Sequence, residues 1–244
     1  MPIWPEGAFR DVRVLITGGT SGIGAGIAKA YLTEGARVCV TGVTAAEADA
    51  ARDAMPGVEA VVLDVADAAA VAGLVAGLDD LAHVVNCAGV IRRHEEHDPA
   101  IFAQVIDINL NGTMRVCAAA RPALAANGGT ILNTASMLSF FGGGLVPGYS
   151  ASKGGIAQLT KSLAIAYAAD GIRVNALAPG WIATPLTAAL QADSTRSGPI
   201  LARTPLGRWG TPDDLAGAAL FLASPLAAFI TGVVLPVDGG YLVT

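Results

Sequence analysis

The sequence predicts a single α/β domain built on a doubly wound, parallel sheet of seven strands with helices on both faces. Apolar runs rich in valine and isoleucine alternate with helical patterns to the end of the chain, as a parallel sheet with crossover helices requires. The runs Val58–Leu63 and Ile172–Leu177 are mostly apolar, which is typical of strands buried on both faces. No linker, repeat or charge block divides the chain, so residues 1–244 are expected to form one domain.

Each element follows from this alternation. The strands are expected at 12–17, 37–41, 58–63, 82–86, 129–135, 172–178 and 232–236. A glycine turn follows the first strand and leads into a helical pattern that carries Ile27, Ala30, Tyr31 and Leu32. Further helices are expected at 66–78, 98–126 and 149–169, and the segment 182–201 is predicted to cover the site as a lid.

Composition excludes several classes of protein. The net charge of −5 disfavours nucleic acid as the main partner. Two uncharged stretches, 122–152 and 215–237, are long enough to span a bilayer, but polar residues, glycine or proline interrupt them, so no membrane helix is expected. No signal-like run precedes Val12, and three cysteines in apolar settings indicate a cytoplasmic protein. No zinc-ligand spacing is present, so no metal is expected.

Tyr149 and Lys153 are the most informative pair of polar side chains. They lie four residues apart on an expected helix and therefore share one face. A free tyrosine has a pKa near 10, and a neighbouring cation favours the phenolate. The pair is a candidate acid/base device in which Lys153 lowers the pKa of Tyr149. Because such pairs also occur by chance in helices, other motifs must decide.

The glycine turn supplies a second motif. Gly18, Gly22 and Gly24 lie between an expected strand and an expected helix. Glycines there allow positive φ and let the backbone approach a pyrophosphate at the helix N-terminus. The spacing differs from the commoner Gly-x-Gly-x2-Gly fingerprint, so a plain strand-to-helix turn remains an alternative.

Five motifs together resemble the short-chain dehydrogenase/reductase family in order and spacing. They are Thr17-Gly18-x3-Gly22-x-Gly24, Asn86-Cys87-Ala88-Gly89, Ser136, Tyr149-x3-Lys153 and Pro179-Gly180, and they span nearly the whole chain. The resemblance implies a Rossmann-type fold and hydride transfer between a nicotinamide cofactor and a secondary alcohol or ketone. Cys87 stands where the family usually has a second asparagine.

The resemblance also implies four catalytic roles. Tyr149 would be the proton donor and acceptor, and Lys153 would lower its pKa and hold the nicotinamide ribose. Ser136 would donate a hydrogen bond to the substrate oxygen. Asn109 matches the residue that holds a proton-relaying water next to the lysine; a helix-bending asparagine is the alternative.

Cofactor contacts are implied in the same way for Gly18, Thr20, Ser21, Gly22, Ile23, Gly24, Asp64, Val65, Asn86, Ala88, Gly89, Tyr149, Lys153, Pro179, Gly180, Ile182 and Thr184. Asp64 matches the aspartate that the family places against adenine; a helix cap is its alternative role. Residues 40–44 carry neither an acid for a 2′-hydroxyl nor an arginine for a 2′-phosphate. Because an unpaired dianion is costly to bury, NAD is expected in preference to NADP.

The substrate is expected to be a sugar acid or a polyol. Segments 89–93, 135–140 and 190–210 resemble one branch of the family, the 2-deoxy-D-gluconate 3-dehydrogenases and 2-dehydro-3-deoxy-D-gluconate 5-dehydrogenases. Candidate substrate residues are Arg92, Arg93, His94, Met137, Trp181 and Arg196. The arginines could pair with a carboxylate, and for each of them a surface arginine is the alternative. An apolar wall of Phe140, Phe141, Leu145 and Trp181 would also suit a cyclic or hydrophobic alcohol.

The sequence also bears on two alternative functions and on the oligomeric state. An NADPH-dependent carbonyl or 3-ketoacyl reductase would use the same four residues and remains an alternative. A non-catalytic dinucleotide sensor is disfavoured because all four catalytic positions are intact. The family resemblance implies a homotetramer, with interfaces from the helices at 98–126 and 149–169 and the strand at 232–236.

Overall fold

Seven parallel strands form one sheet in the order β3-β2-β1-β4-β5-β6-β7 in the computed structural model, which describes residue 5 and residues 7–244. Their bounds are β1 Arg13–Thr17, β2 Arg37–Gly42, β3 Glu59–Val62, β4 Leu81–Asn86, β5 Thr130–Thr134, β6 Arg173–Pro179 and β7 Val234–Val237. The predicted seven-stranded parallel sheet is confirmed, and each predicted strand end lies within two residues of the observed one.

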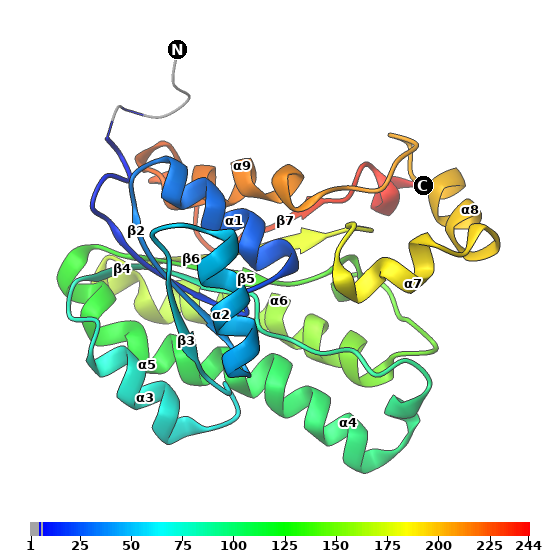
Figure 1. Cartoon of the computed structure of the whole chain (residues 1–244), viewed down its shortest axis with the longest axis horizontal. Helices are drawn as coiled ribbons and strands as arrows, with labels where there is room; N and C mark the ends of the chain where they lie inside the picture. Colours follow the sequence, from blue (N-terminus) through cyan, green and yellow to red (C-terminus); the bar gives the residue numbers. More distant parts are fainter. Residues whose placement is uncertain (1–4, 6) are drawn as a thin grey trace.

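Helices cover both faces of the sheet (Figure 1). Helices α1 and α9 pack against each other on one face, while α3 packs against α5 and α4 against α6 on the other. Their bounds are α1 Gly22–Thr33, α2 Ala45–Ala54, α3 Ala68–Ala76, α4 Pro99–Ile106, α5 Gly112–Asn127, α6 Pro147–Tyr167, α7 Ala188–Gln191, α8 Ser194–Arg203 and α9 Pro212–Ala223. The doubly wound arrangement expected from the alternating pattern is therefore present.

The sheet divides the apolar core into two main layers. Val14 and Ile16 of β1 point into the layer beneath α1 and α9, and Leu15 between them points into the opposite layer. This two-sided burial follows from the period-2 alternation of side chains along a strand. It also explains why the strand sequences are apolar at consecutive positions.

The predicted helix at 98–126 is interrupted. A π-turn, Asp107–Asn111, separates α4 from α5. The side chain of Asn109 inside this turn hydrogen-bonds both backbone groups of Val90, with its Oδ1 2.8 Å from the amide nitrogen and its Nδ2 2.9 Å from the carbonyl oxygen. The expectation of one continuous helix is wrong, because a contact outside the helix holds the extra residue of the turn in place.

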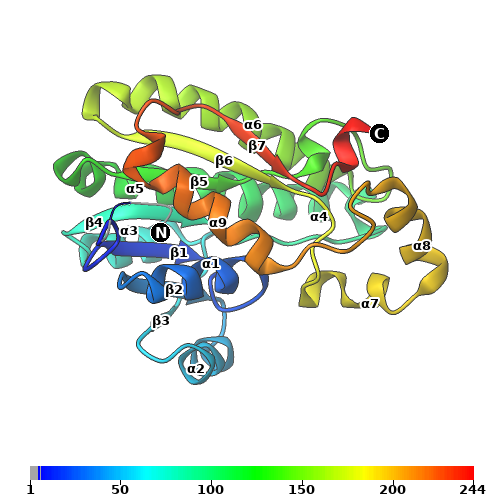
Figure 2. The same ribbon diagram turned by 90° about the horizontal axis from the view of Figure 1, so that it is seen from above.

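The order of the strands places a crevice at one edge of the sheet. Strand β1 lies between β2 and β4, so the chain connections run in opposite directions on its two sides. Ligands of such sheets bind at the carboxyl ends of the strands at this point. Figure 2 shows α7 and α8 beyond the same ends of the strands. Within the described residues, no helix combines the length and apolar sequence needed to cross a bilayer.

Candidate active site

The glycine turn after β1 lies against the turn after β4. Gly18 has φ +64°, and a Cβ atom there would lie 2.7 Å from the backbone nitrogen of Ala88. A Cβ atom on Gly24 would lie 2.4 Å from the carbonyl oxygen of Gly18. Ser21 makes no side-chain cap at the start of α1, so the first amides of that helix are left for another acceptor. The residues present therefore fit a dinucleotide phosphate group.

A cleft of about 580 Å³ runs along the carboxyl ends of the strands. Its volume is within the range usual for cofactor sites. Thirteen of the residues predicted for the cofactor line it, namely Gly18, Thr20, Ser21, Gly22, Ile23, Gly24, Asp64, Val65, Ala88, Gly89, Tyr149, Lys153 and Thr184. Pro179, Gly180 and Ile182 line a smaller adjoining pocket instead.

Asn86 does not line this cleft. It is 3 % exposed, and its Nδ2 donates to Oδ1 of Asn133 at 3.0 Å. Asn133 donates in turn to the hydroxyl of Thr160 at 3.0 Å. The Asn86 side chain thus joins β4 to β5 and α6, and its cofactor contact stays a prediction. Its neighbour Cys87 lines the cleft, with the Thr134 hydroxyl donating to its sulfur at 3.3 Å.

A carboxylate missed by the sequence analysis lines the cleft near the end of β2. Glu47, in the first turn of α2, accepts a hydrogen bond from the amide of Val43 at 2.7 Å. A Cβ atom on Gly42 would lie 2.6 Å from Oε2 of Glu47 and 2.9 Å from Oγ1 of Thr20. The absence of a side chain at Gly42 therefore makes room for the carboxylate. The acid that is missing from the end of β2 is supplied by the next helix.

Tyr149 and Ser136 meet at the junction of the cleft and the smaller pocket. Burial raises the pKa of Tyr149 above its usual value, while a hydrogen bond with the Ser136 side chain and, less strongly, the charge of Arg93 lower it. The spacing of Tyr149 and Lys153 predicted instead that Lys153 lowers the pKa of Tyr149. In the structure the direction is opposite, because desolvation of the phenolate outweighs the nearby polar groups.

Lys153 lies beside Tyr149 without a direct bond to its hydroxyl. Its ammonium is 5.5 Å from the centre of the Tyr149 ring and donates to the carbonyl oxygen of Thr134 at 2.6 Å. The side chain is 5 % exposed, and burial lowers the pKa of Lys153 to about 8. Because Lys153 also lines the cleft, its positive charge can attract a ligand bound there.

Asn109 completes the predicted catalytic group. It is fully buried, and besides its two bonds to Val90 its Nδ2 donates to the Ser152 hydroxyl at 3.1 Å. A Cβ atom on Gly89 would lie 3.2 Å from Oδ1 of Asn109 and 3.9 Å from Nζ of Lys153, so the two side chains approach each other around Gly89. The structure thus brings all four predicted catalytic residues to one end of the sheet.

The smaller pocket, of about 110 Å³, opens beside the Tyr149 side chain. Three of the predicted substrate residues, Arg93, Met137 and Trp181, line it together with Ser136. The guanidinium of Arg93 has no hydrogen bond or ion pair to any described residue, and the like charge of Arg196 lowers its pKa further after the effect of burial. Arg93 therefore lies next to Tyr149, and Arg196 is near enough to Arg93 for its charge to act on that guanidinium.

The remaining substrate candidates lie elsewhere. Arg92 lines the larger cleft, and His94 is exposed outside these pockets. Phe140 and Leu145 are exposed, and Phe141 stacks on Tyr241, so the predicted apolar wall is wrong except for Trp181. The apolar lining comes instead from Ile91, Leu138 and Leu186, together with Ile23, Met137, Pro179 and Ile182.

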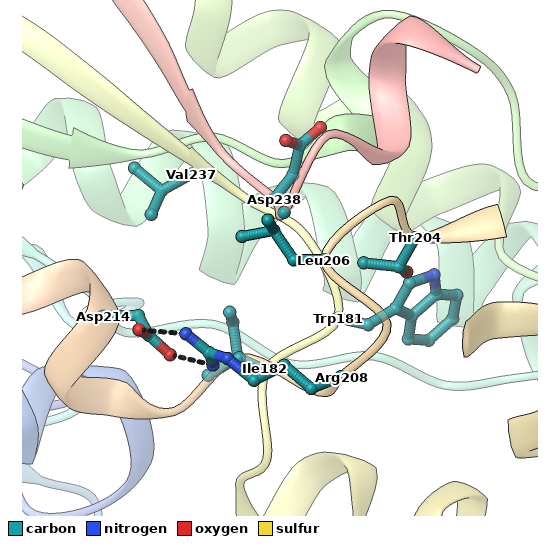
Figure 3. Close-up of a pocket in the computed structure, with 10 residues that line it drawn as sticks. Trp181, Ile182, Thr204, Leu206, Arg208, Asp214, Val237 and Asp238 are labelled. Carbon is teal, nitrogen blue, oxygen red and sulfur yellow. Dashed lines mark hydrogen bonds and ion pairs between the residues drawn. The ribbon is translucent and has the colours of Figure 1, made fainter. Parts of the chain in front are cut away.

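The start of the segment predicted as a lid, residues 182–201, is held by contacts with residues 208–214. Ile182 pairs with Gly210 in an isolated β-bridge. Arg208 donates to both carboxylate oxygens of Asp214 at 2.7 and 2.8 Å, as Figure 3 shows, and this pair lowers the pKa of Asp214. The surrounding pocket of about 140 Å³ lies on the far side of Ile182 and Trp181. The Arg208–Asp214 pair therefore ties the chain together at the base of this segment.

This geometry is matched by known proteins. A family model described as "Enoyl-(Acyl carrier protein) reductase" matches residues 18–242. Two relatives are called 2-dehydro-3-deoxy-D-gluconate 5-dehydrogenase. That of Pseudoalteromonas atlantica is 48% identical over 65% of this chain and 64% of its own length, and that of Bacillus subtilis is 40% identical over 96% of both chains. The cis-4-hydroxycyclohexanecarboxylate dehydrogenase of Sinomonas cyclohexanicum is 41% identical over 96% of this chain and 98% of its own.

A solved structure supports the same relationship. The gluconate 5-dehydrogenase of Burkholderia cenocepacia, in complex with NADP and tartrate, is 34% identical and has a TM-score of 0.89. The match covers 97% of this chain and 98% of that one. Sequence similarity and fold therefore agree over nearly the full length.

Proposed function

Because this chain belongs to the short-chain dehydrogenase/reductase family, we propose that it oxidises the secondary alcohol of a hydroxy acid of sugar-acid type, with NAD as acceptor. Its activity is that of an oxidoreductase acting on a CH–OH group with a nicotinamide cofactor. The observation that carries the substrate class is Arg93, whose guanidinium lines the pocket beside Tyr149. When bound, the nicotinamide ring supplies the site that accepts or returns the hydride.

We propose one role in the reaction for each of four side chains. Tyr149 accepts the proton of the substrate hydroxyl, and Ser136 donates a hydrogen bond to the same oxygen as charge develops on it. Lys153 places a positive charge beside the phenolate and within reach of a ribose in the cleft. Asn109 holds the π-turn against Val90, next to the lysine. Burial of the Tyr149 hydroxyl keeps the proton transfer away from bulk water.

Arg93 is proposed to bind the carboxylate of the substrate. Its guanidinium lines the pocket with no hydrogen bond or ion pair to a described residue, so a carboxylate there would form a charge-assisted hydrogen bond. The Bacillus relative and the Sinomonas relative are both named for substrates that combine a hydroxyl or keto group with a carboxylate. The apolar lining around Ile91 and Leu186 would accept either carbon skeleton, open-chain or cyclic.

A panel of paired substrates tests this proposal. Purified enzyme is given NAD with gluconate-type acids, hydroxycyclohexanecarboxylates and their uncharged alcohol analogues, and the reduced cofactor is followed by absorbance. Arg93→Gln should raise KM for the carboxylates about 10- to 100-fold, because a hydrogen bond to a charged group contributes roughly 1.5–3 kcal/mol. The uncharged analogues should be affected less than twofold or so.

Arg10→Gln is the matched control, since Arg10 is exposed on the N-terminal side of β1, remote from the pocket lining. It should leave both substrate classes unchanged. Equal loss on charged and uncharged substrates in Arg93→Gln, or turnover of hydrophobic ketones alone, would contradict the hydroxy-acid assignment.

We assign the choice of NAD to Glu47. Its carboxylate lies at the carboxyl end of β2, where the family binds the adenosine ribose. A carboxylate there can accept a hydrogen bond from a 2′-hydroxyl, whereas it repels a 2′-phosphate. The Burkholderia enzyme was crystallised with NADP, so the preference is proposed for this chain from its own residues.

A homotetramer in a reducing compartment is also proposed. Large apolar side chains are exposed at Ile165 of α6, at Phe229 and at Val243 near the C-terminus, and all three cysteines are unpaired. Light scattering should give four times the mass of the chain. In such an assembly, the segment 182–201 is proposed to act as the substrate lid, hinged at the Arg208–Asp214 pair.

A further inference from the structure

Glu96 is a buried carboxylate with no role in the site described so far. It lies in the 3₁₀ turn Glu95–His97 and is only 1 % exposed. Its Oε1 accepts a hydrogen bond from the amide of Arg92 at 2.8 Å, and its Oε2 accepts one from the amide of Tyr149 at 2.7 Å. A charge buried this deeply is costly unless its oxygens are satisfied, and here each oxygen holds one backbone N–H.

The bond to Tyr149 caps the helix that carries the acid/base group. Helix α6 begins at Pro147, and its own N-cap residue, Val146, offers no side-chain acceptor. The amide of Tyr149 is one of the free donors of the first turn, and Glu96 satisfies it from another segment of the chain. A Cβ atom on Gly148 would lie 3.3 Å from Oε2, so the start of the helix packs closely on the carboxylate.

The second bond fixes the segment that carries the substrate arginine. The amide of Arg92 is held by the same carboxylate, and Arg93 follows directly in the chain. A further hydrogen bond holds this turn: the amide of His94 donates to the carbonyl oxygen of Leu145 at 2.9 Å. His94 itself has φ +71°. One side chain thus connects the backbones that present the Tyr149 hydroxyl and the Arg93 guanidinium to the same pocket.

We propose that Glu96 is a positioning residue that fixes the spacing between the proton acceptor Tyr149 and the carboxylate-binding Arg93. The Arg93 part of this inference rests on the proposed function, whereas the Tyr149 part rests on the family's reaction alone. A misplacement of about 1 Å at a reacting group can cost roughly 100-fold in rate. A carboxylate that holds both groups is therefore expected to affect turnover more than cofactor binding.

The charge of Glu96 gives the proposal an electrostatic signature. The polar groups facing the Tyr149 hydroxyl are Ser136, Arg93, Glu96 and, 5.5 Å from the ring centre, Lys153. Among them, the hydrogen bond with Ser136 and the charge of Arg93 lower the pKa of Tyr149, and the charge of Glu96 raises it. Neutralising Glu96 should therefore lower the pKa of Tyr149 and move the acidic limb of the oxidation rate to lower pH.

The test compares Glu96→Gln, Glu96→Asp and the control Glu95→Gln. Glu95 is adjacent and exposed, so its variant removes the same charge without touching the two amides. Rates are normalised to the number of cofactor-binding sites, which separates loss of folded protein from loss of turnover. Glu96→Gln can accept only one of the two bonds and should lower kcat roughly 10- to 100-fold with a shifted acidic limb.

Glu96→Asp keeps the charge on a shorter side chain, so it should lower kcat while leaving the acidic limb where it is in the wild type. Glu95→Gln should match the wild type in both measurements. Unchanged normalised kcat and pH profile in Glu96→Gln would overturn the proposal. If that variant does not fold, a wild-type normalised kcat in Glu96→Asp would overturn it equally. Failure of the Arg93 assignment would appear separately, as equal effects on charged and uncharged substrates.

Discussion

Two of the proposed catalytic side chains are harder to charge in this protein than in water. Burial raises the pKa of Tyr149 and lowers the pKa of Lys153 to about 8. Tyr149 can serve as a base only where other groups favour its phenolate, and the side chains of Ser136 and Arg93 supply part of that effect. The positive nicotinamide of the oxidised cofactor would add to it in the adjoining cleft.

Removing the phenolic hydroxyl separates chemistry from binding. Tyr149→Phe should lower kcat by roughly 10³-fold, because a positioned acid/base group contributes about 10²- to 10⁴-fold. The Kd of the cofactor, measured by fluorescence, should change little. Tyr167→Phe makes the same change at the other end of α6 and should retain activity. Comparable turnover in Tyr149→Phe and wild type would end the mechanism.

Glu47 is expected to determine the choice between the two cofactors. Glu47→Gln removes the charge that would repel a 2′-phosphate and weakens the bond to a 2′-hydroxyl. The ratio of kcat/KM for NAD to that for NADP should fall about 10-fold or more. Asp53→Asn removes an exposed carboxylate from the same helix and should leave the ratio unchanged. A wild type that prefers NADP would contradict the assignment directly.

The sequence predicted local parts of the site better than parts assembled from distant segments. Tyr149 and Lys153 could be paired in advance because helical spacing alone puts them on one face. Glu47 could not be assigned, because its role depends on the side chain folding back over Gly42. Glu96 was missed for a similar reason, since its partner Tyr149 lies 53 residues away. Glu47 does stand in a local helix-start pattern, Thr44-x-x-Glu47, but that pattern alone does not predict that the carboxylate reaches the cleft.

At the scale of elements, the strands were predictable and the helix breaks were not. Apolar runs fix a buried strand to within one or two residues because both faces must be covered. The π-turn at Asp107–Asn111 has no comparable pattern, since it depends on the contact of Asn109 with Val90. Insertions of this kind are frequent at functional sites, and this one lies next to Lys153.

The start of α1 is expected to tolerate no side chain at Gly24. Gly24→Ala would place a methyl group 2.4 Å from the carbonyl oxygen of Gly18, so the helix must shift away from the glycine turn. The Kd of the cofactor should rise at least about 10-fold, because the amides at the helix start lose their position. Isothermal calorimetry measures this directly.

The control for that change is another helical glycine. Gly73 lies in α3, and a Cβ atom there meets nothing within 4 Å. Gly73→Ala should leave the cofactor Kd unchanged and stabilise the protein by roughly 0.5–1 kcal/mol, as expected when alanine replaces glycine inside a helix. Wild-type affinity in Gly24→Ala would show that the close approach of turn and helix is not needed.

At the scale of the whole molecule, the site is built at the expense of stability. Polar groups are buried where the cleft adjoins the apolar layers, and the Lys153 ammonium is a charged example whose burial is costly. The lowered pKa of Lys153 measures the free-energy cost of burying its charge. Below about pH 8 both the folded and the unfolded chain carry the proton, so the cost of burying the charge is fully present.

Between about pH 8 and the ordinary lysine value of 10.5, only the unfolded chain keeps this proton, so rising pH stabilises the folded state. The Lys153→Met variant has no titratable group at this position and should lack this pH-dependent stabilisation. Without cofactor, the free energy of unfolding of the wild type, relative to this variant, should therefore increase by about 3 kcal/mol between pH 7 and pH 10.5. Urea unfolding of both proteins across this range measures the difference. A constant difference would mean that the Lys153 ammonium is solvated rather than buried as a charge.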